Sequence, residues 1–344
     1  MNEVQSPAFD SLLVLSFGGP EGNDDVLPFL ENVLRGKNVP RERMLEVAEH
    51  YYHFDGVSPI NEQNRALIAA LKIELDARGI DLPIYWGNRN WNPLLTDTMQ
   101  RMADDGRSRA LAFFTSIFSS YSGCRQYREN IAQAQQEVGP SAPQVHKVRM
   151  AFNHPQFVAA QSELLATALA IFDNSPDIPV LFTAHSIPMT MADNCRYVEQ
   201  LKAAAQLIAE TVRVRHWELV FQSRSGPPTQ PWLEPDVCKR IEELAASGAR
   251  SLAIVPLGFI SDHMEVLYDL DTEAAETCQR LGITLARVPT VGVHPRFVAM
   301  IADLVEERLF NYSERPALGS YGPSHDVCPV DCCLYPRTRP AQSL

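Results

Sequence analysis

Short runs of apolar residues alternate with longer amphipathic segments along most of this chain. The candidate strands are Leu12–Ser16, Ile84–Gly87, Ala110–Thr115, Val180–Ala184, Glu218–Gln222 and Ser251–Leu257. Amphipathic segments include 64–78 and 155–172, and a last helix is expected at about 295–310. Strands that alternate with helices are typical of a parallel sheet covered by helices. The pattern therefore predicts an α/β fold.

The chain also repeats part of its own pattern. The segment GRSRALAFFTSIFSSYSG (106–123) resembles GARSLAIVPLGFISDHME (248–265), and YWGNRNWNP (85–93) resembles FQSRSG…PWLEP (221–235) in the same order. Matching segments in matching order predict two related halves. We expect a first half at 1–150 with the helix at 295–312 packed back on it, a second half at 151–294, and an irregular tail at 313–344. Ligands of parallel sheets bind beyond the carboxyl ends of the strands, so the strand-end loops of both halves are expected around one cleft.

Charge and composition exclude several classes of function. The formal net charge of −12 argues against nucleic acid as a partner, because phosphate binding needs a basic face. No apolar run reaches about 18 residues, which predicts that no helix spans a membrane. The first residues, MNEVQSPAFD, lack the basic and apolar regions of a secretory signal, so a cytoplasmic location is expected. We also expect a monomer.

The loop after the first strand, SFGGPEGNDD, contains Gly18 and Gly19, which allow a ligand to approach the backbone closely. It is not a GxGxxG fingerprint, and no phosphate-loop lysine follows it. A nucleotide site is therefore poorly supported.

Two polar motifs follow predicted strands and are candidates for a catalytic or metal-binding role. In VLFTAHSIPM, His185 lies directly after an apolar strand, at the edge where ligands are expected. In SDHMEVLYDLDTEA, Glu265, Asp269 and Glu273 recur every four residues and form one acidic stripe on a helix. Such a stripe is often only a solvated helix face. Here it begins at a strand end after Asp262 and His263, and oxygen and imidazole donors together suit Fe²⁺ binding and proton transfer.

Taken together, these motifs resemble the ferrochelatase family over residues 10–310. The matching stretches are SFGGP (16–20), GVSPINEQN (56–64), GNRNWNP (87–93), QSRSG…PWLEP (222–235), TAHSIPM (183–189) and SDHMEVLYDLD (262–271). The resemblance implies a lyase that inserts Fe²⁺ into a porphyrin in haem biosynthesis, with two Rossmann-like domains around a porphyrin cleft. It implies that His185 and Glu265 form the metal-insertion centre and bind the substrate iron. It also implies that Asp269 and Glu273 form an acidic ladder for metal or protons.

Further residues are candidates for porphyrin contacts. Phe17 has no donor atom for metal, so its expected role is packing against the macrocycle. Arg89 and Arg125 are expected to pair with propionates, because a guanidinium meets a carboxylate with two hydrogen bonds. Ser119, Ser120 and Tyr121, together with Ser58 of the GVSPINEQN motif, are candidates for hydrogen bonds.

Three cysteines, Cys328, Cys332 and Cys333, are crowded into the tail sequence HDVCPVDCC. Some ferrochelatases bind a [2Fe–2S] cluster with one internal and three C-terminal cysteines, and this arrangement resembles theirs, with Cys124 as the internal ligand. The C-x3-C-C spacing departs from the better-known spacings and leaves open whether Cys332 and Cys333 both bind. Zinc is the rival metal. The three other cysteines, at positions 195, 238 and 278, are expected to be packing residues.

Two other functions compete with this interpretation. A carrier would bind porphyrin or haem without turnover, but it has no need of a His185 and acidic-ladder relay beside the ligand. A cluster-based redox or iron sensor would depend on the tail and not on the cleft motifs. Among porphyrins, coproporphyrin III is favoured over protoporphyrin IX, because the cysteine tail without a membrane-binding segment resembles actinobacterial members of the family.

Overall fold

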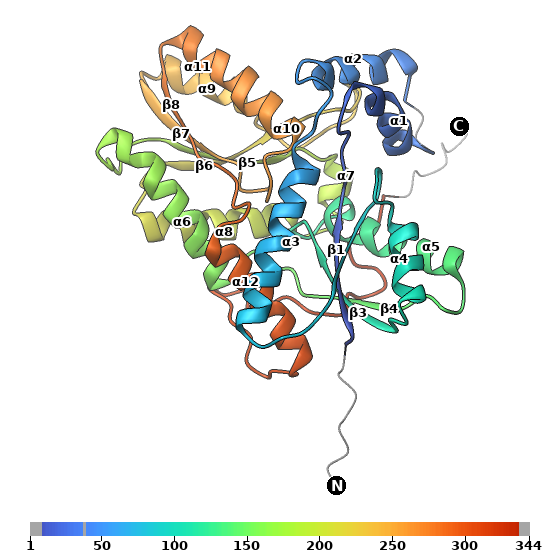
Figure 1. Cartoon of the computed structure of the whole chain (residues 1–344). Coiled ribbons are helices and arrows are strands. Elements are labelled where there is room, and N and C mark those ends of the chain that lie inside the picture. Colours follow the sequence, from blue (N-terminus) through green and yellow to red (C-terminus); the bar gives the residue numbers. More distant parts are fainter. Residues whose placement is uncertain (1–8, 37–38, 337–344) are drawn as a thin grey trace, which may run out of the picture.

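A computed structural model describes residues 9–36 and 39–336, which form two four-stranded parallel sheets (Figure 1). The first sheet has the order β2-β1-β3-β4 and the second the order β6-β5-β7-β8. The strands are β1 (Ser11–Ser16), β2 (Ile84–Asn88), β3 (Arg109–Phe114), β4 (Gln144–Lys147), β5 (Val180–His185), β6 (Trp217–Gln222), β7 (Ser251–Val255) and β8 (Thr284–Arg287). The same order in both sheets confirms the predicted α/β fold with two related Rossmann-like halves.

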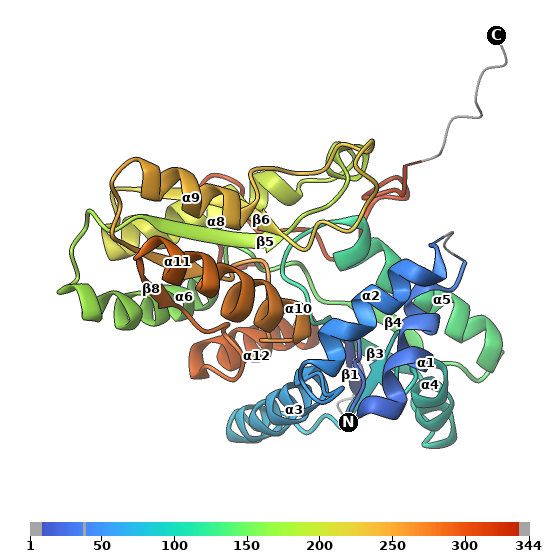
Figure 2. The ribbon, with the colours of Figure 1, turned by 90° about the horizontal axis from the view of Figure 1, so that it is seen from above.

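Helices cover both sheets: α3, α4 and α5 lie around the first sheet and α6, α8, α9 and α11 around the second, while α1 and α2 pack together beyond the end of β1 (Figure 2). The helices are α1 (Asn23–Leu34), α2 (Arg41–Tyr52), α3 (Ile60–Ala77), α4 (Leu95–Asp104), α5 (Gln126–Val138), α6 (Pro155–Leu169), α7 (Met189–Ala192), α8 (Tyr197–Val212), α9 (Val237–Ala246), α10 (Met264–Val266), α11 (Ala275–Leu281) and α12 (Pro295–Leu309). Two π-helical segments are η1 (Tyr121–Arg125) and η3 (Leu267–Ala274), and η2 (Ala170–Phe172) is a 3₁₀ turn. No helix in 9–36 or 39–336 is long and apolar enough to cross a membrane.

The strands β4 and β8 are absent from the sequence prediction. Each has only four residues, lies at the edge of its sheet, and mixes polar with apolar side chains (QVHK and TLAR). The predicted strands, in contrast, are central or strongly apolar; all six residues of β1 are buried. The tail between 313 and 336 contains no helix or strand, as expected, and its remaining residues, 337–344, lie outside the described part of the chain.

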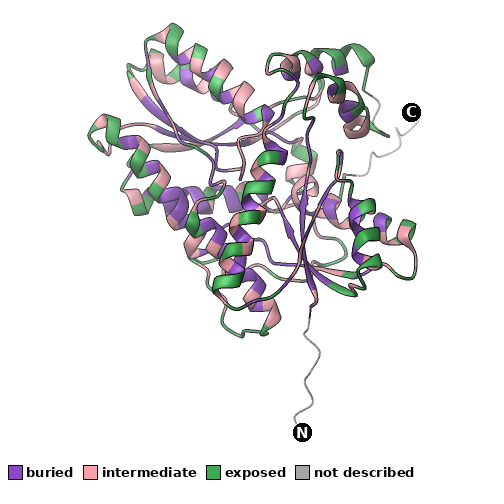
Figure 3. Cartoon of the chain, viewed as in Figure 1, coloured by how far each residue is buried: buried purple, intermediate pink, exposed green. Residues whose placement is uncertain are grey.

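The main hydrophobic core is shared by the two halves. Buried residues (purple in Figure 3) follow the strands and the inner faces of the helices. One cluster includes Leu12 of β1, Leu71 of α3, Phe182 of β5 and Ile301 of α12, all fully buried. Helix α12 accordingly packs against α3 of the first half and α6 of the second.

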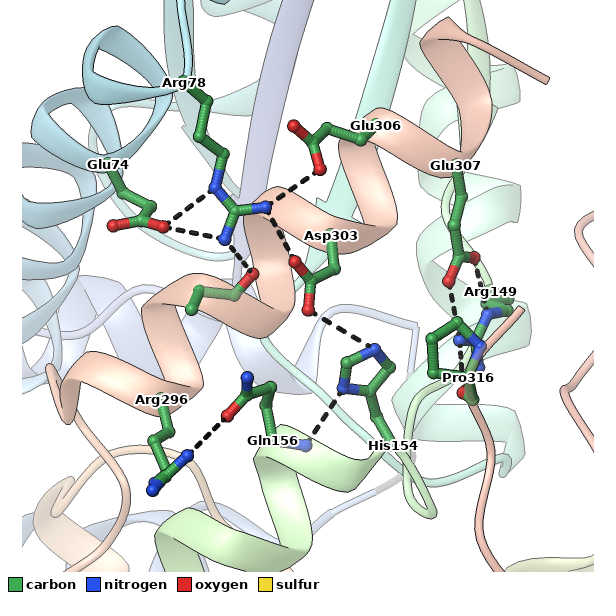
Figure 4. A network of polar contacts seen from close by, with 11 residues as sticks. Glu74, Arg78, Arg149, His154, Gln156, Arg296, Asp303, Glu306, Glu307 and Pro316 are labelled. Carbon is green, nitrogen blue, oxygen red and sulfur yellow. Dashed lines mark hydrogen bonds and ion pairs between the residues drawn. The ribbon is translucent and has the colours of Figure 1, made fainter. Parts of the chain in front are cut away.

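A network of charged residues fastens α12 to the first half (Figure 4). Arg78, at the end of α3, binds Asp303 at 2.7 Å and Glu306 at 3.0 Å. Arg149 and Glu307 form an ion pair at 2.7 Å whose side chains are 0% and 2% exposed. Because a buried charge is tolerated only when it is paired, this contact fixes the position of α12 against the first half.

The two helices that pack together, α6 and α12, begin in the same way. Each starts with a His-Pro pair, and Nδ1 of His154 and of His294 accepts a hydrogen bond at 3.3 Å from the backbone N–H two residues later. Proline suits the first helical position and the histidine serves as the N-cap. The segments NHPQFVA (153–159) and VHPRFVA (293–299) are thus a third repeated pair, which the sequence analysis missed.

Candidate active site and metal centre

His185 is the last residue of β5, at the strand end where ligands of parallel sheets bind. Its Nδ1 makes a hydrogen bond with the backbone oxygen of Ser186. A carbonyl can only accept, so Nδ1 carries a hydrogen, and in the neutral imidazole the lone pair is then on Nε2. Nε2 lies 3.6 Å from Oε2 of Glu265, in α10. Two acceptor atoms face each other favourably only when a proton or a cation lies between them, so this pair is suited to holding either one.

Asp269 and Glu273 continue from Glu265 along one helical run. They lie in η3, a π-helix, whereas the sequence analysis assumed an ordinary helix. The wider π-helical turn, closed by i→i+5 hydrogen bonds, still keeps residues four apart on nearly the same face, so the acidic stripe survives the correction. Single π-helical turns are frequent at functional sites.

Asp269 is held by two side chains from the end of β6. Gln222 donates to Asp269 at 3.2 Å, and Ser223 donates a second hydrogen bond to the same carboxylate oxygen. Burial raises the pKa of Asp269 to about 7, and the nearby charges of Glu265 and Glu273 act in the same direction, against the Ser223 hydrogen bond. A carboxyl group with a pKa near neutrality takes up and releases protons at physiological pH. The QSRSG motif was a signal for Gln222 and Ser223 that the sequence analysis did not use.

The acidic ladder ends in a cavity of about 620 Å³ in the second half. Asp269 and Glu273 line it from η3, and Asp236 lines it from the start of α9. Burial raises the pKa of Glu273, and the charges of Asp236 and Glu276 add to this effect. The stripe therefore leads from the His185–Glu265 pair to a polar, negatively charged space.

Residues of the first half hold the loop that carries Glu265. Gln63 of α3 makes two hydrogen bonds with the backbone of Asp262, at 2.9 and 3.3 Å. His50 of α2 stacks on Tyr268 with ring centroids 3.9 Å apart. The carboxylate of Asp262 binds Thr290 at 2.7 Å and also pairs with an arginine at the end of β8. The Asp262 carboxylate is thus used in these structural contacts and is not one of the groups that face His185.

Phe17 and Arg89 lie together in the first half. The guanidinium of Arg89 is 5.5 Å from the ring centroid of Phe17 and 4.8 Å from that of Tyr127. Nε of Arg89 donates to Asn130 at 2.8 Å, which leaves its terminal nitrogens for another partner. These positions are compatible with the predicted porphyrin contacts, which stay predictions.

Of the three candidate serines, Ser119 and Ser120 form hydrogen bonds within the protein, and Ser58 is buried. Ser58 is buried beside Gly19, where a Cβ atom at position 19 would come within 2.8 Å of the Ser58 Cβ. Ser119 makes two hydrogen bonds with Gln200 of α8, at 2.7 and 3.0 Å. Ser120 caps η1 by accepting from a backbone N–H. Their predicted contacts with porphyrin therefore stay untested.

Tyr121 and Arg125, at the two ends of η1, contact the tail. Arg125 pairs with Glu129 at 2.8 Å and donates to the backbone oxygen of Val330 at 2.5 Å. Tyr121 donates to Glu129 at 3.0 Å and packs edge-on against Tyr335. Both residues hold the tail in place, a role that the sequence analysis did not foresee. Their predicted porphyrin contacts stay predictions.

The four predicted cluster ligands line one cavity of about 320 Å³. Cys124 lies in η1, in the connection between β3 and α5, and hydrogen-bonds Cys328 of the tail. The sulfur atoms of Cys332 and Cys333 are 3.6 Å apart. Cys195, which was expected only to pack in the interior, lines the same cavity. Five thiols from three separate parts of the chain thus meet at one place.

The donor set at this cavity fits a thiolate-bound metal. The ring nitrogen of His325 and the sulfurs of Cys328 and Cys332 all lie within 4.8 Å of one another. The hydrogen bond with Cys124 holds the pKa of the Cys328 thiol well below its usual range, and the ammonium of Lys147 acts in the same direction. A thiol that ionises readily is a ready metal ligand. Soft thiolate donors suit an iron–sulfur cluster and also zinc.

Comparison with known proteins identifies the family of this chain. The sequence profile of the ferrochelatases matches residues 10–309. Ferrochelatase of Rhodopirellula baltica is 64% identical over 97% of this chain and 96% of that protein. Coproporphyrin III ferrochelatase of Streptomyces griseus is 49% identical over 99% and 98% of the two chains. Among solved structures, SirB from Bacillus subtilis with Fe³⁺ has a TM-score of 0.56 at 11% identity, covers 88% of this chain and 96% of its own, and supports the fold alone. The chain belongs to the ferrochelatase family.

Proposed function

We propose that the chain inserts Fe²⁺ into coproporphyrin III in haem biosynthesis, with His185 and Glu265 as its catalytic pair. Ferrochelatases are lyases that insert a metal into a porphyrin. The preference for coproporphyrin III is supported by the relatives from Streptomyces griseus and Frankia alni, which carry that name and are 49% and 51% identical to this chain. The observation that carries the catalytic assignment is the 3.6 Å approach of the His185 Nε2 atom to the Glu265 carboxylate.

The reaction replaces two pyrrole protons by one Fe²⁺ ion, so the site must bind the incoming iron and remove both protons. In our proposal the lone pair of His185 Nε2 accepts a pyrrole proton or meets the iron. Glu265 balances the charge and passes protons on. Asp269, with its pKa of about 7, takes them next, and Glu273 releases them at the polar cavity.

The decisive experiment is a side-by-side insertion assay under anaerobic, reducing conditions. Purified protein is given Fe²⁺ with either coproporphyrin III or protoporphyrin IX, and kcat/KM is measured from the change in porphyrin absorbance. A higher value for coproporphyrin III is expected. An equal or higher value for protoporphyrin IX contradicts the substrate assignment. Tight binding of both porphyrins without metallation favours a carrier.

Contacts to the porphyrin are part of the same proposal. The residues are Phe17, Ser58, Arg89, Ser119, Tyr121 and Arg125. Arg89 is the best supported, because the hydrogen bond to Asn130 uses only Nε and leaves its terminal nitrogens for a propionate. Arg89→Leu should raise KM for the porphyrin more than it lowers kcat.

We also propose that Cys124, Cys328, Cys332 and Cys333 hold a [2Fe–2S] cluster. When bound, such a cluster supplies redox-active iron bridged by sulfide. The support is the common cavity, the hydrogen bond between Cys124 and Cys328, and the 3.6 Å contact of the vicinal pair. Analysis of iron, zinc and acid-labile sulfide in purified protein tests this; one zinc without sulfide contradicts the cluster.

The division into halves is proposed as 1–150, with the helix at 295–312 packed on it, 151–294, and the tail at 313–344. The identical order of the two sheets and the contacts of α12 with α3 support it. Limited proteolysis should cut first near these boundaries. The chain is further proposed to be a monomer, which light scattering of the purified protein can test.

A further inference from the structure

Lys147 is a buried cation without a carboxylate partner. It is the last residue of β4 and only 8% exposed. Its Nζ donates to two backbone oxygens, of His325 at 3.1 Å and of Val148 at 3.4 Å. Within 9–36 and 39–336, no Asp or Glu oxygen lies within ion-pair distance of this ammonium.

A buried ammonium that meets only neutral carbonyls is costly, because it has lost its water without gaining a counter-charge. The other deeply buried cation nearby, Arg149, is paired with Glu307. Lys147 therefore needs another source of negative charge. Its hydrogen-bond partner His325 belongs to the cysteine centre, because the His325 ring nitrogen lies within 4.8 Å of the sulfurs of Cys328 and Cys332. The charge of Lys147 also acts on the thiols of Cys124 and Cys328.

We propose that Lys147 is a positioning residue of the cysteine metal centre, whose ammonium neutralises the thiolate ligands Cys124 and Cys328. Its hydrogen bond to the backbone oxygen of His325 also fixes the segment that leads into Cys328. This inference rests on the proposed cluster, because only ligated thiolates supply a lasting negative charge beside the ammonium. Groups outside the ligands tune both the affinity and the potential of a metal site.

The test compares Lys147→Met with Lys202→Met on the exposed surface of α8. Methionine keeps an unbranched side chain, one atom shorter than lysine, and removes the charge. Iron and sulfide content, the rate of cluster loss to a chelator, and the reduction potential are measured. In Lys147→Met the cluster should be lost about 10- to 100-fold faster. Its potential should become more negative, because the reduced cluster carries one more negative charge. Lys147→Arg should stay closer to the unmodified protein, and Lys202→Met should match it.

Repeating the substitution in a Cys124→Ser variant distinguishes charge neutralisation at the cluster from simple anchoring of the tail. In Cys124→Ser, which lacks the cluster, Lys147→Met removes an uncompensated buried charge and should raise the melting temperature. In the cluster-loaded protein the same substitution should lower it. A similar drop in melting temperature with and without the cluster, or an unchanged reduction potential of the cluster, overturns the proposal.

The metal analysis distinguishes failure of this inference from failure of the cluster proposal. If the unmodified protein contains zinc and no sulfide, the cluster proposal fails. Lys147 is then tested by zinc retention: faster zinc loss in Lys147→Met supports its role, and unchanged retention overturns it. Protein that binds neither metal contradicts both.

Discussion

Asp269 should reduce the stability of the folded protein at neutral pH, and Asp269→Asn should recover that stability while slowing catalysis. The carboxyl group is held in a desolvated position that raises its pKa from 3.8 to about 7. This difference corresponds to about 4 kcal/mol. Asparagine cannot ionise, but it keeps an oxygen that can accept from Ser223.

The sign follows from proton binding. Between pH 4 and 7 the folded protein holds a proton on Asp269 that the unfolded chain has already released. Stability therefore falls as pH rises through this window. At pH 8 the free energy of unfolding of Asp269→Asn should exceed that of the unmodified protein by up to about 4 kcal/mol, and at pH 5 by less than half of that.

Urea unfolding at pH 5 and pH 8, followed by circular dichroism, measures both differences. The matched control is Asp81→Asn, at an exposed position outside the site, for which no pH-dependent gain is expected. Iron insertion is assayed on the same preparations and should be slower in Asp269→Asn. A gain of the same size at both pH values, or no gain at pH 8, refutes the reasoning that desolvation of an ionised Asp269 is costly.

Three further predictions concern the two candidate centres. His185→Ala should abolish iron insertion while circular dichroism stays unchanged; near-normal turnover would remove His185 from the mechanism. Glu265→Gln should lower kcat by about 10²- to 10⁴-fold, as for loss of a general acid–base group. Glu273→Gln should cost less, because it lies two steps farther along the ladder; equal losses at both positions contradict the graded relay. Cys124→Ser should give colourless protein with a lower melting temperature, since a metal that binds only the native state stabilises it; a variant that keeps its colour and sulfide contradicts Cys124 as a ligand.

The sequence was most informative where one physical requirement determines the residue type. Central strands such as β1 are buried on both faces and must be apolar, so they were predicted to within a few residues. His185 and Glu265 were both expected at the ligand-binding edge because each follows a predicted strand. Their pairing was implied by the resemblance to the ferrochelatases. Edge strands carry no such requirement, and β4 and β8 were missed because they are edge strands of only four residues with mixed polar and apolar side chains. The other two edge strands, β2 and β6, are longer and were predicted.

The remaining features depend on contacts between distant segments. A four-residue acidic spacing fits both an α-helix and a π-helix, so the wider turn at Asp269 could not be predicted. The tail has no periodicity that indicates its path, so the engagement of Arg125 with Val330 was not foreseen. Likewise, nothing in the segment QVHK distinguishes Lys147 from a surface lysine, because its burial results from a tail about 180 residues later in the chain.

The position of α12 has a consequence for synthesis of the protein on the ribosome. Leu67, Leu71 and Leu75 of α3 belong to the buried cluster that includes Met300, Ile301 and Leu304 of α12. The ribosome completes α3 long before α12, which ends at residue 309. At about 5–20 residues per second, the 232 residues between the end of α3 at 77 and the end of α12 at 309 take roughly 12 to 46 seconds to make. During that interval the apolar face of α3 that α12 later buries stays exposed on the nascent chain. We expect a ribosome-associated chaperone to bind this face until α12 has been made.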